Sequence, residues 1–154
     1  MNSRRYWDDI KDGEHLPCRP FSLTVDEIID FARKYDPQVF HVDPEAASST
    51  RFGGIIASSL HTLASCTRSL VDALSGYEII IGLEMDTVAL PNVVRPDDLL
   101  TIDARWSDLR RSRSKPGQGI ATVRYSVLNQ RGETVLATGF RYMIACRNES
   151  PSGT

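Results

Sequence analysis

The chain has 154 residues, 41% of them apolar and 25% charged, and its formal net charge at pH 7 is −2. This length predicts one domain that is large enough to bury a hydrophobic core. The slightly acidic balance argues against a general nucleic-acid-binding protein, which usually carries a basic excess. The longest apolar runs fall well short of the roughly 20 residues that cross a membrane, so we expect no membrane association.

The cysteine content is low and gives no sign of a metal site. Cys18, Cys66 and Cys146 are widely spaced and show no metal-ligand pattern. Basic residues near the start have no apolar stretch behind them, so we expect no signal peptide. Together these features predict a cytoplasmic protein with reduced thiols.

The first regular element expected along the chain is a short helix. Residues 1–23 have no strong periodicity and are expected to form an extended lead-in. Thr24 and, three residues later, Glu27 form a capping box. Apolar residues at helical spacing follow, which predicts an amphipathic helix over about 25–35.

The next segment places a carboxylate and an imidazole five residues apart between two prolines. Pro37 directly follows Asp36, and Pro44 comes three residues after His41. Because each proline disfavours helical geometry in the residue before it, we expect a pinned loop that holds Asp36 and His41 in a fixed relation. Such a pair can move a proton near neutral pH. Alternatively, Asp36 only ends the helix and His41 only caps a turn.

Two more helices are expected before the sheet begins. Asp43 followed by Pro44 is typical of a helix start, which predicts a short helix over about 44–47. A longer helix is expected from about Ser58 to Leu74. Its apolar face would contain Leu60, Leu63, Ala64, Thr67, Leu70, Val71 and Leu74. The other side of its first half is small or polar, which would let a sheet wrap closely around the helix.

From about residue 77 onward the apolar pattern has a period of two, which predicts half-buried strands. Strands are expected over about 79–90, 100–107, 121–127 and 134–146. No internal repeat or linker divides the chain. Residues 1–148 are therefore expected to form one domain, and residues 149–154 are expected to be disordered.

Five segments resemble the MaoC-like dehydratase family, which includes the (R)-specific enoyl-CoA hydratases and has the hotdog fold. They lie at residues 6–13, 36–47, 52–59, 94–99 and 127–133. The resemblance implies an α+β domain in which an antiparallel sheet wraps around a central helix. It also implies a homodimer with an acyl tunnel at the subunit interface.

The resemblance further implies reversible hydration of a 2-enoyl-CoA to an (R)-3-hydroxyacyl-CoA. No metal or redox cofactor is expected, and coenzyme A enters only as part of the substrate. In the resembled hydratases the matching residues hold a water. Asp36 would take a proton from that water as it attacks the β-carbon, and His41 would orient the water and protonate the α-carbon. The alternatives are an acyl-CoA thioesterase and an acyl-thioester binding module with weakened catalysis.

The start of the long helix is the expected oxyanion site, because backbone N–H groups at a helix start stabilise negative charge. Where the resembled enzymes usually have a histidine-glycine pair, this chain has Ser58 and Ser59. The N–H of Ser59 is therefore the expected catalytic donor. Ser58 is expected to cap the helix and, with Gly54 and Thr67, to bind substrate. For Thr67 core packing is the interpretation we favour, and His61 is expected to be a packed residue.

A dense basic cluster occupies residues 105–115. Within it, Arg111 and Arg113 are the candidates to contact the phosphates of coenzyme A, because guanidinium matches phosphate well. The alternative, which we favour, is a solvated hairpin with Pro116 and Gly117 at its tip.

Overall fold

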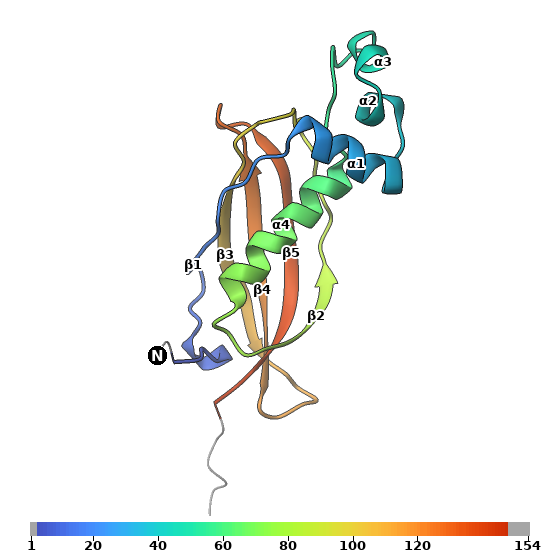
Figure 1. Ribbon diagram of the computed structural model, residues 1–154. Coiled ribbons are helices and arrows are strands. Elements are labelled where there is room, and N and C mark those ends of the chain that lie inside the picture. The colour runs from blue at the N-terminus through green and yellow to red at the C-terminus, as the bar shows by residue number, and fades with distance from the viewer. Residues whose placement is uncertain (1–2, 148–154) are drawn as a thin grey trace, which may run out of the picture.

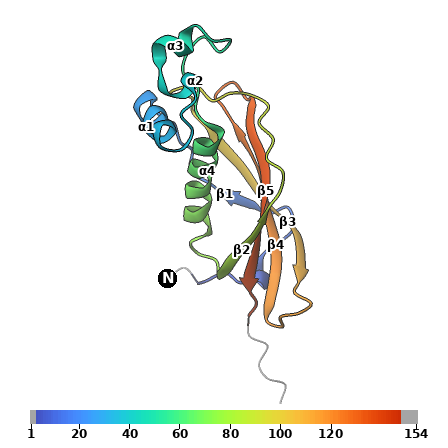
Figure 2. The same cartoon turned by 90° about the vertical axis from the view of Figure 1, so that its right-hand side faces the viewer.

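The computed structural model describes residues 3–147, so the expectation for residues 149–154 lies outside the described part. A five-stranded antiparallel sheet has a long helix against one face, and three shorter helices gather at one end (Figures 1 and 2). The elements in chain order are η1 (Trp7–Asp9), β1 (His15–Pro17), α1 (Val25–Tyr35), α2 (Val39–Val42), α3 (Pro44–Ser48), α4 (Ser59–Leu74), β2 (Ile79–Met85), β3 (Thr101–Arg111), β4 (Gln118–Leu128) and β5 (Thr134–Ala145).

The strands follow the order β1-β3-β4-β5-β2 across the sheet, and every neighbouring pair is antiparallel. The apolar residues of the period-two pattern face the helix. Ala104 and Trp106 of β3 and Val123 of β4 are fully buried. Arg105, between the first two, and Arg124, next to Val123, are exposed. One face of the sheet is therefore built for the core and the other for solvent.

The four predicted strands are confirmed, but the first is shorter than expected. β2 ends at Met85, and past it only a single bridge joins Ala89 to Ala137. The chain leaves the ladder at Asp86, whose carbonyl accepts a hydrogen bond from the Thr138 hydroxyl at 3.1 Å. The lead-in was expected to be extended; it also holds the short helix η1, and its strand β1 pairs with β3.

The long helix α4 turns its small side toward the sheet, as the sequence indicated. Its buried residues are Thr62, Cys66, Ser69, Leu70 and Leu74. Most of the predicted apolar face points outward: Leu60 is 53% and Val71 is 56% exposed. Small side chains let the helix approach the sheet closely, and the apolar stripe is left without a partner in the protomer.

The helices before α4 follow the local signals, with one addition. The capping box of Thr24 and Glu27 starts α1, and Asp43 caps α3. The segment between the two prolines was expected to be a loop, but it contains the single helical turn α2. Proline restricts the residue before it and not the residues after it. Asp36 accordingly leaves helical geometry, and the chain is free to turn helically again from Val39.

Within residues 3–147, no helix is both long and apolar enough to cross a membrane.

Candidate active site

A cavity of about 240 Å³ lies where α1, α2 and the first turn of α4 come together, at the end of the sheet that carries the short helices (Figures 1 and 2). Its lining residues are Asp36, Gln38, His41, Ile56, Ala57, Ser59, Thr62, Leu90, Pro91, Asn92, Val93, Val94 and Val135. The three residues expected to be catalytic, Asp36, His41 and Ser59, therefore share one cavity.

The orientation of the His41 ring is fixed by a backbone carbonyl. His41 is 4% exposed, and its Nδ1 lies 2.6 Å from the carbonyl oxygen of Ile56. Because a carbonyl only accepts hydrogen bonds, Nδ1 must carry the hydrogen. In the neutral ring Nε2 is then an acceptor, and it lies 3.4 Å from Oδ2 of Asp36.

Asp36 follows α1 directly, and both of its carboxylate oxygens accept hydrogen bonds. The hydroxyl of Ser58 donates to Oδ2 at 2.7 Å, and the amide of Gln38 donates to Oδ1 at 2.9 Å. These two bonds, led by that of Ser58, and then the nearby imidazole hold the pKa of Asp36 below its ordinary value of 3.8. Asp36 is therefore an ionised acceptor at neutral pH.

Ser58 joins the helix start to the carboxylate. Its side chain is fully buried, and its Oγ accepts from the N–H of Leu60 at 3.2 Å while donating to Asp36. The predicted capping role is confirmed. Ser58 does not line the cavity, and its hydroxyl is already engaged as donor and acceptor, so it is not available as a nucleophile.

The first N–H of α4, that of Ser59, differs from the next three in having no hydrogen-bond partner in the described chain. The N–H groups of Leu60, His61 and Thr62 all bond to atoms of Ser58. The N–H of Ser59 makes no hydrogen bond among residues 3–147, and Ser59 is an exposed residue that lines the cavity. A free backbone donor thus stands at the helix N-terminus, where the helix dipole favours negative charge.

The other expected substrate-binding residues lie outside the cavity. Gly54 is half-buried in the preceding loop and is not part of the lining. Thr67 is exposed and donates to the carbonyl of Leu63 at 3.0 Å, so core packing, the interpretation favoured for it, is wrong. His61 is packed as predicted: its ring stacks on Phe31 with centroids 4.5 Å apart.

The basic hairpin lies at the opposite end of the sheet from α1 and α2 (Figures 1 and 2). Arg111 pairs with Asp8 at 2.6 Å and lies over the ring of Trp7. Arg113 is an exposed residue of the β3–β4 turn. Neither arginine reaches the cavity of its own protomer.

The apolar wall of the cavity was not predicted from the sequence. The segment 90–94, which is apolar except for Asn92 and comes after β2 in the chain, forms it together with Val135 of β5. The segment is tied down by a hydrogen bond from the Ala57 N–H to the Val94 carbonyl at 2.8 Å, and by one from the Asn92 amide to the Thr134 carbonyl at 2.9 Å. The sequence offered one indirect sign of this wall: the segment lies next to residues 94–99, which resemble the family.

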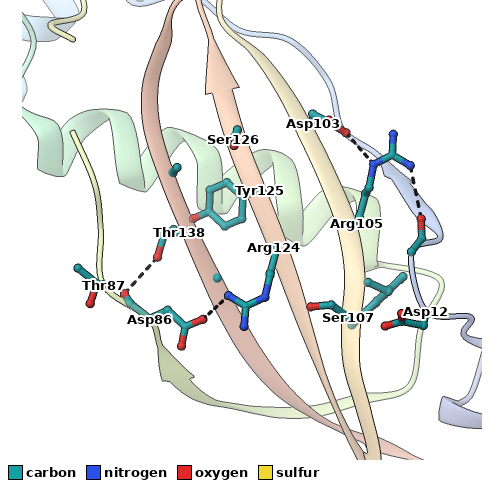
Figure 3. Close-up of a pocket in the computed structure, with 14 residues that line it drawn as sticks. Asp12, Asp86, Thr87, Asp103, Arg105, Ser107, Arg124, Tyr125, Ser126 and Thr138 are labelled. Carbon is teal, nitrogen blue, oxygen red and sulfur yellow. Dashed lines mark hydrogen bonds and ion pairs between the residues drawn. The ribbon is translucent and has the colours of Figure 1, made fainter. Parts of the chain in front are cut away.

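A larger hollow, of about 560 Å³, lies on the outer face of the sheet (Figure 3). Its arginines are already paired with carboxylates. Arg124 bonds to Asp86 at 2.9 Å and to Asp108 at 2.8 Å, and Arg105 lies 3.4 Å from Asp103. The residues that line this hollow include no histidine and no helix start, so its size does not make it the reactive site. No three His, Cys, Asp or Glu side chains in the described chain are grouped so that they could hold a metal ion.

Comparison with known proteins identifies the family of this chain. The family model for the MaoC like domain matches residues 11–128, and the chain belongs to this family. A curated relative, the uncharacterized protein YdeM of Bacillus subtilis, is 36% identical over 125 residues, which are 80% of this chain and 87% of YdeM. The crystal structure of a MaoC-like dehydratase from Rhodospirillum rubrum is 32% identical, with a TM-score of 0.83 over 94% of this chain and 99% of that one.

The fold is the expected hotdog fold, an α+β arrangement of an antiparallel sheet around one long helix. An (R)-hydratase from A. caviae, involved in PHA biosynthesis, aligns with a TM-score of 0.69 over 90% of this chain and 98% of its own. At 20% identity this likeness shows the shared fold alone.

Proposed function

We propose that this protein catalyses the reversible addition of water to a 2-enoyl-CoA, giving an (R)-3-hydroxyacyl-CoA. One observation carries the proposal: Oδ2 of Asp36 and Nε2 of His41 lie 3.4 Å apart in a cavity that Ser59 also lines. In the neutral ring both atoms are acceptors. Membership of the MaoC-like family and the fold shared with an (R)-hydratase support the same reaction.

Two acceptors at this distance are best satisfied by a molecule that donates to both. A water that gives one hydrogen bond to Asp36 and one to His41 meets that need. Its oxygen lone pair is then turned away from both side chains and toward the cavity. A β-carbon placed there is attacked by an oriented nucleophile, which removes much of the entropic barrier.

The proton balance follows from the tautomer of His41. When the ring starts neutral, Nε2 carries no proton, so the proton that reaches the α-carbon must come from the water itself. We assign its transfer to Nε2 and its return to the α-carbon also to Nε2, because the low pKa of Asp36 makes this carboxylate a weak proton acceptor. Asp36 stabilises the imidazolium that forms between the two steps. Water is thus added across the double bond with no net change in the side chains.

The negative charge that develops on the thioester oxygen requires a donor. The unpaired N–H of Ser59, at the positive end of α4, is suited to this role. The apolar wall of residues 90–94 and Val135 provides a surface for the acyl chain. In the proposed reaction, side chains and one backbone N–H of this chain perform acid–base chemistry on a coenzyme A thioester.

The direct test is to incubate the protein with crotonyl-CoA and longer 2-enoyl-CoAs and to follow the absorbance of the conjugated thioester. We expect this absorbance to fall and an (R)-3-hydroxyacyl-CoA to appear, identified by chiral chromatography. Release of free thiol in the same tube would show a thioesterase instead. Binding of the thioester without loss of absorbance would show a catalytically silent binding module.

A further inference from the structure

We propose that Gln38 is a positioning residue that holds Oδ1 of Asp36, so that Oδ2 alone is presented to His41 and the reacting water. The inference rests on the proposed function, in which Asp36 and His41 are the groups that touch the water. Gln38 lines the same cavity but is two residues away from Asp36 along the chain.

Gln38 is linked to both members of the pair through its backbone. Its N–H donates to the Asp36 carbonyl at 2.8 Å, and its own carbonyl accepts from the His41 N–H at 2.9 Å. Pro37, whose ring restricts the backbone, stands between Gln38 and Asp36. These backbone bonds fix where the Gln38 side chain starts, and the side-chain amide then reaches Oδ1 of Asp36 at 2.9 Å.

The side-chain bond completes a clamp on the carboxylate. The second side-chain torsion of an aspartate is broad, so a carboxylate held at one oxygen can still rotate. Ser58 holds Oδ2 from the buried side and Gln38 holds Oδ1 from the exposed side. With donors on both oxygens, the carboxylate cannot rotate and Oδ2 stays directed at Nε2 of His41. A fixed pair of acceptors is what orientation of the water requires.

The clamp also suits the charge state of Asp36. Gln38 is a neutral donor that adds no charge to the cavity, and hydrogen bonds to a carboxylate favour its ionised form. Its bond is the second cause, after that of Ser58, of the lowered pKa of Asp36. Removing the Gln38 donor should therefore loosen the carboxylate and raise its pKa together.

The test uses Gln38→Met, which keeps the length of the side chain and removes its donor. Because residue 38 is exposed and its backbone bonds remain, we expect the melting temperature to stay close to that of the unchanged protein. Glu45→Met, an exposed change on the neighbouring α3, is the matched control. Turnover of a 2-enoyl-CoA should fall about tenfold, as for a lost hydrogen bond to a charged group, with KM little changed. Glu45→Met should leave turnover unchanged.

A second readout does not depend on the reaction. The pKa of the Asp36 carboxyl is followed by NMR of carbon-labelled aspartate, with Asp36→Asn used to assign its signal. A pKa raised in Gln38→Met supports the clamp even if the unchanged protein hydrates no enoyl-CoA, an outcome that would refute only the proposed function. A Gln38→Met protein with unchanged turnover and unchanged carboxyl titration would overturn the inference and leave the hydratase in place. A lowered melting temperature with normal turnover would likewise overturn it, in favour of a merely structural bond.

Discussion

The proposed activation of the thioester depends on one backbone donor, the N–H of Ser59. Ser59 is the first residue of α4, where proline is favoured because the N–H has no partner within the helix. Ser58 has φ −59° and ψ 137°, an extended geometry that the residue before a proline adopts readily. A proline at position 59 therefore removes the donor without disturbing the helix.

We expect Ser59→Pro to fold with a normal circular dichroism spectrum and to lose about 10²–10³-fold in kcat for enoyl-CoA hydration, the usual cost of removing one oxyanion donor. Ser59→Gly is the matched control, because it keeps the N–H and relaxes the backbone, so its activity should stay the same or rise. Full activity in a folded proline variant would show that this N–H does not bind the thioester oxygen.

At the residue scale, the sequence indicated candidate side chains for the site but not the contacts between them. Asp36 and His41 were singled out by their spacing and by the family resemblance, and the cap at Ser58 by its place before the long helix. The hydrogen bond from Ser58 to Asp36 joins residues 22 positions apart. It exists only because α4 begins beside the end of α1, which is a tertiary fact that no local pattern contains.

At the scale of elements, the contact between α1 and α4 includes a histidine that is sensitive to pH. His61 stacks on Phe31, and burial lowers the pKa of His61 below its ordinary value of 6.5. Its Nδ1 is also buried without a hydrogen-bond partner in the described chain. In the unfolded chain this histidine takes up a proton near pH 6.5, whereas in the folded chain it does so only at lower pH. Stability should therefore fall as the pH drops through this window.

We expect the melting temperature to decrease between pH 7.5 and 5.5, and His61→Phe to remove part of this decrease. Phenylalanine keeps the ring contact with Phe31, cannot titrate and leaves no unpaired nitrogen. Scanning calorimetry at several pH values gives the change of melting temperature with pH for the unchanged protein and for His61→Phe. The carboxylates with lowered pKa values, such as Glu27, lose their contribution only below about pH 4.5 and so act outside this window. Equal slopes in both proteins would refute this role of His61.

The elements themselves were largely predictable, and the exceptions have physical causes. The capping box and the proline at position 44 marked α1 and α3, and alternation marked β3, β4 and β5. The turn α2 was missed because its four residues, which lie among the six between Pro37 and Pro44, are too few to show a helical period. β2 was predicted too long because its apolar pattern continues past residue 85, where the backbone has already left the ladder.

At the scale of the whole molecule, the edge strand β2 of the sheet is apolar and uncovered. β2 pairs only with β5, and its exposed residues include Ile81, which is 57% exposed, and Leu83. An open apolar strand edge is usually paired or covered. The exposed stripe of α4, with Val71, is a second apolar surface in the protomer. Both features favour the homodimer that the family resemblance implied.

Light scattering at micromolar concentration should give about twice the chain mass of 17.2 kDa. Ile81→Lys places a charge on the β2 edge and should shift the mass toward that of one chain. Val25→Lys, a similar change at an exposed apolar residue of α1, is the control and should leave the mass unchanged. A monomer in the unchanged protein would contradict the dimer.

The strand order was beyond the reach of periodicity. Strand patterns do not say which strands are neighbours, whereas the small residues of α4 did indicate the side that faces the sheet. The family resemblance supplied the hotdog arrangement, and the structure shows which face of α4 is buried. The cavity wall at 90–94 has no chemical signature in the sequence, because it is built from ordinary apolar residues.

The most direct test of the central claim, that Asp36 and His41 act on one water, is a double-mutant cycle in the hydration of an enoyl-CoA. Asp36→Asn and His41→Gln keep size and hydrogen bonding, so both variants should fold and keep their oligomeric state. Each should lose about 10²–10⁴-fold in kcat, the typical contribution of acid–base catalysis. The double variant should be little worse than the poorer single one, since residues that act as a unit are strongly non-additive. Near-normal turnover per folded molecule in either single variant, or two losses that multiply in the double variant, would contradict the shared-water mechanism.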